Sequence, residues 1–361
     1  MKTFKFFFWI PVFCLGLVVK GLREDPLYFE LPFQINETFE RSKIGELMEE
    51  GFIAPISIQL STDSGRPLFY ESNIRTTVCD DEICEIMYIR LYWDLVGEYV
   101  GYDTVSRHPL TKFDHEPFTE NDYTRLHELL QNEGSILKFK QKSDLIDKEK
   151  VKASDVVDGT TGATALEIKE EVVEGALYSS YTLWHLAYNG QIKNMIITST
   201  KKRLNKQLFK HLLDSDRSGY KLFAFHNFEE NDFITYKNYW LTSLKEDMPL
   251  TRKYILKNIP DGQWENHHVQ DEVCAMFNLY DVNTRTYLLN KIEKTVEISN
   301  VSIEYVSTSL TDMNRNQVKQ FISLLSGKRN LTSKTMSNVN SASKDKNFKY
   351  SYLVDEYNFD D

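Results

Sequence analysis

Alternating apolar and polar positions mark the N-terminal part of the chain as a region of strands. The clearest strand covers residues 85–93, where both alternating sets of side chains are largely apolar, so we expect both of its faces to be covered. A turn at 94–97 and a second extended stretch at 99–102 follow, which predicts a hairpin. Residues 52–60 also alternate, and Pro55 within them favours a position at the edge of the sheet.

Shorter patterns complete this region. Thr119 and Asp122 have the spacing of a capping pair and predict that a helix begins here. We expect two further short strands at 76–79 and 135–142, and a helical stretch at 42–50. These elements together predict a small α+β domain built on an antiparallel sheet.

From about residue 165 onward the pattern changes, because apolar residues recur at helical spacing between Gly, Pro, Asn and Asp. The segments with this spacing are 165–188, 203–213, 219–227, 232–245, 249–258, 266–279, 283–291, 299–309 and 314–325. Paired short helices of this size resemble an α-solenoid such as a HEAT-like array, although no motif recurs at a fixed period. An irregular helical domain is the alternative.

The C-terminal residues differ in composition from the helical region. Residues 327–347 are rich in Ser, Lys, Asn and Thr, which predicts a flexible segment. Residues 350–361 mix aromatic and acidic side chains, which could fold back onto the protein or act as a docking tail.

The N-terminus has the pattern of an export signal. Lys5 and Lys20 flank residues 6–19, which carry no charge. This run of about 14 residues is shorter than the roughly 20 that a transmembrane helix needs. We therefore predict a signal peptide over residues 1–21, an extracytoplasmic (periplasmic or secreted) mature protein, and no direct transmembrane segment after cleavage.

Charge and cysteine content narrow the function further. The net charge of −10 argues against general nucleic-acid binding, which needs a basic face. Cys79 and Cys84 are close in sequence, and an oxidising compartment favours a disulfide between them. A metal site at this pair is disfavoured because no second Cys or His pair has matching spacing. Cys274 lies in an apolar helical stretch and is expected to be a buried free thiol.

One short motif carries chemistry. Residues 158–164 follow the pattern Asp, two residues, Thr, Gly, Ala, Thr, with the defining positions Asp158, Thr161, Gly162, Ala163 and Thr164. The motif resembles the flavinylation motif of the FMN-binding domain family, which includes the C subunit of the sodium-translocating NADH:quinone reductase and the G subunit of the Rnf complex. The resemblance extends over about residues 76–188, since a hairpin, a helix and a strand precede the motif and a helix follows it.

The resemblance implies a cofactor and partners. In this family a separate flavin transferase, which uses FAD and a divalent metal, links FMN to the last Thr of the motif through a phosphoester, so Thr164 would be the attachment residue. A Thr hydroxyl can act as the nucleophile once a base and a metal are supplied, and Gly and Ala leave the backbone accessible. Amides at the start of the next helix would face the phosphate. The resemblance thus favours an electron carrier that exchanges electrons with a redox partner protein over an enzyme with a substrate of its own.

Two features favour other interpretations. Thr164 and Glu167 also form a capping box, so the motif could be only a helix cap. Ala165 occupies the position where the family often has a second Thr or Ser. The alternative function is a non-catalytic extracytoplasmic interaction or scaffold protein that uses its helical region, and a family-like fold without flavin is a further one. A hydrolase is a third possibility, but the sequence offers no set of a nucleophile and a general base that would support it.

Aromatic side chains after the motif are secondary candidates. Tyr181 and Trp184 could stack on a flavin ring, and His185 lies on the same helix, but such residues more often belong to a core. The sequence thus predicts four parts: a signal peptide at 1–21, an FMN-binding-like α+β domain at 22–190, an all-α domain at 191–326, and a flexible polar and acidic tail at 327–361.

Overall fold

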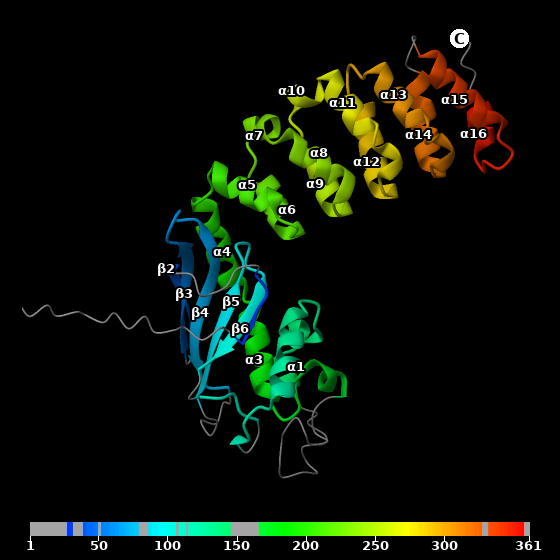
Figure 1. Ribbon diagram of the computed structural model, residues 1–361. Helices are drawn as coiled ribbons and strands as arrows, with labels where there is room; N and C mark the ends of the chain where they lie inside the picture. Colours follow the sequence, from blue (N-terminus) through cyan, green and yellow to red (C-terminus); the bar gives the residue numbers. More distant parts are fainter. Residues whose placement is uncertain are drawn as a thin grey trace, which may run out of the picture. The chain divides into compact units, whose positions relative to one another are not determined.

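The chain divides into two compact units, residues 1–200 and 201–361 (Figure 1). The computed structural model describes residues 27–31, 39–49, 52–78, 86–105, 108–112, 115–145, 166–326 and 331–356. An antiparallel sheet in the first unit is followed by a mostly helical second unit. The predicted α+β class, with an all-α region after the sheet, is therefore confirmed.

The sheet of the first unit has six strands in the order β1-β6-β5-β4-β3-β2, and all neighbours are antiparallel. The strands are β1 Tyr28–Phe29, β2 Phe39–Glu49, β3 Phe52–Ser61, β4 Pro67–Thr76, β5 Met87–Trp93 and β6 Tyr99–Thr104. The predicted hairpin is the pair β5 and β6. Asp94 closes its turn, since its Oδ1 accepts hydrogen bonds of 2.9 Å from the backbone N–H groups of Val96 and Glu98.

Three predictions for the sheet region are wrong. Residues 42–50 were expected to be helical, but β2 pairs with β3 along its length, and Leu47 is buried while its neighbour Met48 is 68% exposed. Strand pairing overrides the helical preference of Glu, Leu and Met here. The predicted strand at 76–79 shares only Thr76 with β4. Residues 135–142 form a 3-10 helix, η2 Ile136–Phe139, instead of a strand.

The position of β3 also differs from the expectation. The strand lies between β2 and β4 and is not an edge strand. Pairing with β4 begins only at Ile56, however, so Pro55 has a partner on one side, Glu46 of β2. The missing N–H of Pro55 therefore interrupts no ladder toward β4.

Helices cover one face of the sheet. They are α1 Glu120–Gln131, which has the predicted capping box, α3 Leu177–Ala187 and α4 Gly190–Lys202. The indole N–H of Trp93 donates a hydrogen bond of 2.8 Å to the carbonyl of Ala187 on α3. The hydroxyls of Tyr70 and Thr200 are 2.8 Å apart, and Thr200 donates to the carbonyl of Leu95 at 2.7 Å. Buried polar contacts thus fix α3 and α4 on the sheet.

The other face of the sheet carries an aromatic cluster. Phe69 and Tyr92 are fully buried, and Phe29 packs edge-on against both, at centroid distances of 5.1 and 5.3 Å. Beside them on β4, Glu71 is buried and forms an ion pair with Arg41. Pairing offsets the cost of placing this carboxylate away from water.

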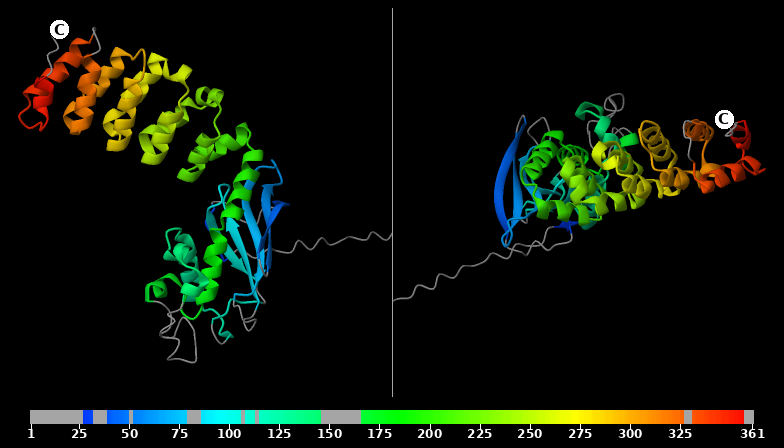
Figure 2. Two further views of the ribbon diagram at one scale, coloured as in Figure 1. Left: turned by 180° about the vertical axis from the view of Figure 1, so that it is seen from behind. Right: turned by 90° about the horizontal axis from the view of Figure 1, so that it is seen from above.

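The second unit consists of successive helix pairs, α5/α6, α8/α9, α11/α12, α13/α14 and α15/α16, each in contact with its neighbours in the row (Figure 2). Its helices are α5 Lys206–Asp214, α6 Ser218–His226, α7 Glu230–Thr235, α8 Lys237–Glu246, α9 Pro249–Asn258, α10 Asp261–Trp264, α11 His267–Cys274, α12 Val282–Glu293, α13 Asn300–Ser307, α14 Arg315–Ser326, α15 Ser333–Lys344 and α16 Ser351–Asp355. The predicted segments from 203 to 325 correspond closely to the helices from α5 to α14, except that 232–245 divides into α7 and α8 and that α10 was not predicted.

The pairs repeat. Their first helices begin at residues 206, 237, 267, 300 and 333, which are 30 to 33 residues apart. Four of these helices share a side-chain cap that accepts a backbone N–H: Asn205, Asn266, Ser299 and Thr332. The sequence Thr-Arg-x-Tyr recurs in α9 and α12, at 251–254 and 284–287. The array is thus a helical repeat with unequal connections, which explains why no fixed period stands out in the sequence.

The two recurring arginines connect neighbouring pairs. Each guanidinium donates to carbonyls before its own helix and to one carbonyl in the next pair. Arg252 donates to Lys245 and Leu279, and Arg285 donates to Phe277, Asn278 and Asp312. Because a guanidinium has five N–H donors in a fixed plane, it can join two loops in this way.

The predicted flexible tail is wrong for residues 331–356. They form α15 and α16, which pack on α13 and α14. Although this part of the chain is rich in Ser, Lys and Asn, it buries four apolar side chains, those of Val339, Ala342, Phe348 and Val354. A few apolar positions suffice here because a neighbouring helix pair already offers a surface to cover.

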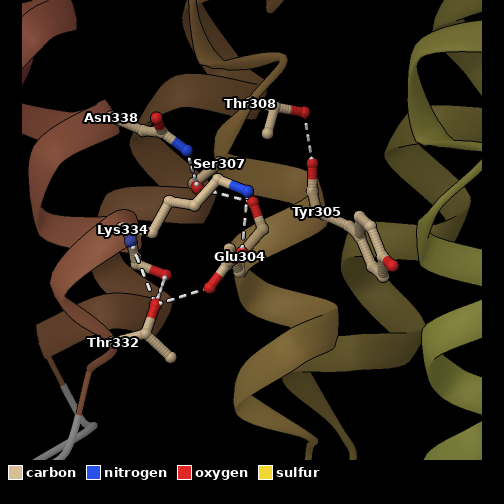
Figure 3. A network of polar contacts seen from close by, with 8 residues as sticks. Glu304, Tyr305, Ser307, Thr308, Thr332, Lys334 and Asn338 are labelled. Carbon is tan, nitrogen blue, oxygen red and sulfur yellow. Dashed lines mark hydrogen bonds and ion pairs between the residues drawn. The ribbon is translucent and has the colours of Figure 1, made fainter.

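Polar contacts reinforce this last pair (Figure 3). Thr332 Oγ1 donates to Glu304 Oε2 at 3.0 Å, and Lys334 Nζ lies 3.1 Å from Glu304 Oε1. Asn338 Nδ2 donates to Ser307 Oγ at 2.9 Å. Side chains that predicted disorder from composition alone therefore join α15 to α13.

Candidate functional site

The predicted attachment motif belongs to a segment, 146–165, that lies outside the described residues. This applies to Asp158, Thr161, Gly162, Ala163 and Thr164, and equally to the predicted signal peptide and the predicted Cys79–Cys84 disulfide. Described residues border the segment on both sides, up to Leu145 and from Leu166 onward.

The two sides of the segment are held together. Before it lie η2 and a second 3-10 turn, η3 Lys142–Asp144, and after it lies η4 Leu166–Glu171, which contacts η2. The ammonium of Lys140 forms an ion pair with the carboxylate of Glu167. Leu145 and Ile168 are fully buried. The chain before residues 146–165 and the chain after them are therefore held close together.

One face of α3 fixes the backbone that leads into the segment. Its side chains at positions i, i+3, i+4 and i+7 each donate a hydrogen bond to a main-chain carbonyl, with lengths of 2.8 to 3.1 Å. The pairs are Tyr181 to Lys140, Trp184 to Asn132, His185 to Leu137 and Tyr188 to Leu130. Because a carbonyl only accepts, His185 carries its proton on Nε2. The residues from 130 to 140 thus follow α3 in the opposite direction.

The same contacts decide between the two interpretations of the aromatic residues. Trp184 is 3% exposed with its indole N–H bonded, so it is a core residue. Tyr181 is half-buried and packs on His185 at a centroid distance of 4.2 Å. Burial raises the pKa of the Tyr181 hydroxyl, with a smaller contribution from Asp144. These side chains position the backbone, and sequence spacing gave no sign of their carbonyl partners.

An aromatic side chain that the sequence did not single out precedes the segment. Phe139, the last residue of η2, is 80% exposed, next to the ion-paired Lys140. Single exposed apolar side chains are common on protein surfaces, and this one offers a planar apolar face. No sequence pattern distinguishes this Phe from a buried one.

The chain after the segment is tied to two helices. The Arg125 guanidinium on α1 donates to the carbonyl of Glu170, and the backbone N–H of Val173 donates to Ser180 Oγ on α3 at 3.0 Å. The carboxylate of Glu167, the partner expected in a capping box with Thr164, pairs with Lys140. The residues that follow the motif are therefore rigidly placed.

Three further features bear on the site: the remaining cysteine, possible metal ligands and possible membrane-spanning helices. Cys274 is a fully buried free thiol, as predicted, and burial raises its pKa to about 12. Within the described ranges, no three His, Cys, Asp or Glu side chains are grouped to hold a metal ion. None of the helices in those ranges is long and apolar enough to span a bilayer.

Comparison with known proteins gives no relative: no protein-family model, curated protein or solved structure matches this chain.

Proposed function

We propose that the protein is an exported electron carrier that holds FMN covalently, through a phosphoester on Thr164. The motif at 158–164 carries this proposal, because it supplies a hydroxyl nucleophile in the residue pattern that flavin transferases modify. Bound FMN would supply the redox centre, and the chain would supply its attachment, its orientation and the docking surfaces. The partners would be a flavin transferase and a redox protein.

The described surroundings of the motif fit such a group. A covalently held flavin needs a fixed point of attachment, and the chain is anchored on both sides of the motif by Lys140–Glu167 and by α3. A flavin also needs contact with its planar ring system, and Phe139, on η2 before the segment, leaves an aromatic face exposed. Export supports covalent attachment, since a dissociable cofactor would be lost outside the cytoplasm.

The direct test is production of the full chain in an exporting host that also makes a flavin transferase. We expect the protein to begin at Leu22, to gain the mass of FMN less water, and to keep flavin fluorescence after denaturation. Thr164→Val should abolish the added mass. Thr160→Val is the matched control, because Thr160 stands at a variable position of the motif, and it should still be modified. A flavin-free wild-type protein, or covalent flavin on Thr164→Val, would contradict the proposal.

The helix pairs of the second unit favour a second candidate function. Stacked helical repeats commonly present an extended surface to a partner protein. In this alternative the protein is a non-catalytic extracytoplasmic scaffold, and residues 158–164 only cap a helix. Its signature is a colourless protein, even with the transferase present, that still captures a partner through residues 201–356. A partner that is bound only by the flavin-loaded protein would instead favour the electron carrier.

A further inference from the structure

A cavity of about 410 Å³ opens in the second unit, between the ends of α6 and α9 and the short helices α7 and α10. This volume is in the range of small-ligand sites. Aromatic rings form its walls, from Phe225, Phe228, Phe233 and Tyr254, and two acidic side chains, Glu230 and Asp261, line it as well. The combination of rings and carboxylates is what a cationic organic group requires.

The aromatic walls are rigid. Phe228 packs edge-on against Phe225 and Phe233, each at a centroid distance of 5.3 Å, and both of these partners are buried. Tyr254 packs edge-on against His226 at 4.0 Å. Burial lowers the pKa of His226, which disfavours a positive charge on this ring. A ligand would therefore meet preformed ring faces.

The negative charge of the cavity comes mainly from Glu230. Its Oε1 lies 3.9 Å from the place that a Cβ on Gly262 would occupy, so the carboxylate reaches from α7 toward α10. Asp261 is attracted to Lys291, whose ammonium lies over the ring of Trp264 at 5.0 Å. Glu230 has no ion pair within the described residues, and its charge is free to bind a ligand.

Helix ends of both signs meet at the cavity. The last turns of α6 and α9 contribute Phe225 and Asn258 to the lining, and α7 and α10 begin there with Glu230 and Asp261. The partial charges of these ends offset one another. The carboxylate of Glu230 and the four rings therefore decide the preference, and they favour a cation over a neutral or anionic ligand.

We propose that this cavity binds an arginine side chain of a partner protein. A guanidinium is planar, stacks on aromatic rings and pairs with carboxylates, so it uses both kinds of lining at once. The inference does not depend on the flavin, because every residue that carries it belongs to the second unit. The helical array would then prefer a partner protein that presents an exposed arginine side chain.

The probe is N-acetylarginine N-methylamide, titrated by NMR or calorimetry into the full mature chain. The neutral isostere N-acetylcitrulline N-methylamide serves as its comparison. We expect the arginine probe to bind and the citrulline probe to bind up to about fivefold more weakly, which is the upper end for an exposed charge pair. Glu230→Gln should remove most of that difference and Tyr254→Leu should weaken binding, whereas Glu246→Gln, on the exposed face of α8, should leave it unchanged.

Several results would overturn the proposal. They are the absence of binding, equal binding of the two probes, or unchanged affinity in Glu230→Gln. Binding of free arginine but not of the blocked probe would identify a small-molecule site and would also overturn it. Circular dichroism of each variant separates a lost contact from a lost fold.

Discussion

The hydroxyl of Tyr181 donates a hydrogen bond of 3.1 Å to the carbonyl oxygen of Lys140, and the ammonium of the same Lys140 pairs with Glu167. One residue therefore connects α3, the chain before residues 146–165 and the chain after them. The motif is the chemically distinctive part of the sequence, and this connection determines where the chain enters and leaves it.

The first prediction concerns that connection. Tyr181→Phe removes the hydroxyl and leaves the carbonyl of Lys140 without this donor, which should lower the free energy of unfolding by about 1 kcal/mol. Urea unfolding measures the change. Tyr352→Phe is the control, because that hydroxyl has no hydrogen-bond partner in the described part of the chain. Equal stability of the two variants would show that the Tyr181 contact contributes nothing.

The second prediction concerns the buried contact between sheet and helix. Thr200 donates to Leu95 and accepts from Tyr70, so Thr200→Val removes two buried hydrogen bonds. We expect a loss of about 1–3 kcal/mol in unfolding free energy, since each bond contributes about 0.5–1.5 kcal/mol. Thr198→Val, an exchange at an exposed position of the same helix, should change stability by less than about 0.5 kcal/mol. Thermal and urea unfolding measure both changes. A loss for Thr200→Val no larger than that for Thr198→Val would contradict the prediction.

The third prediction is a pH dependence in the last helix pair. Hydrogen bonds from Lys334 and then Thr332 lower the pKa of Glu304 below its usual 4.5. Because the folded-state pKa is depressed, the contribution is complete above the unfolded-state pKa and is lost as pH falls through the folded value. The stability difference between wild type and Glu304→Gln should therefore be constant from pH 6 to 7 and shrink below about pH 4.

The control for this pH dependence is Glu297→Gln, at an exposed carboxylate. This exchange leaves the contacts of Glu304 in place, so it separates a general effect of removing one carboxylate from the loss of those contacts. A difference for Glu304→Gln that grows on acidification would contradict the sign derived from the lowered pKa.

The fourth prediction uses the buried thiol. Cys274 is fully buried and burial raises its pKa to about 12, so it should not react with iodoacetamide in the native protein at pH 8. Peptide mass spectrometry after labelling in denaturant should show the modification. Rapid labelling of the native protein would indicate that the pair α11/α12 opens readily.

Sequence patterns predicted the helices well because each one is a local pattern. The helices of the second unit bury apolar side chains at helical spacing, and the capping pair at Thr119 and Asp122 forms as expected. Strand β2 was mistaken for a helix because its pattern is weak and its partner, β3, supplies the structure. The order of the sheet and the pairing at Pro55 depend on contacts between strands, which local spacing does not contain.

The C-terminal helices and the candidate site also depend on contacts that the local sequence pattern does not contain. Composition predicted a flexible chain after residue 327, but α15 gains a surface from α13, which only the folded array provides. The sequence singled out Tyr181, Trp184 and His185 as candidates but did not show what they do. Their partners are main-chain carbonyls some 41 to 52 residues away along the chain. The exposure of Phe139 likewise depends on the fold.

The repeat of helix pairs also determines how the second unit responds to force. Each pair packs mainly on its neighbours, so a pull on the C-terminus loads the contacts between α13 and α15 first. Release of one pair frees about 30 residues, or about 100 Å of extended chain. Under load the second unit would then lengthen in discrete steps, one helix pair at a time.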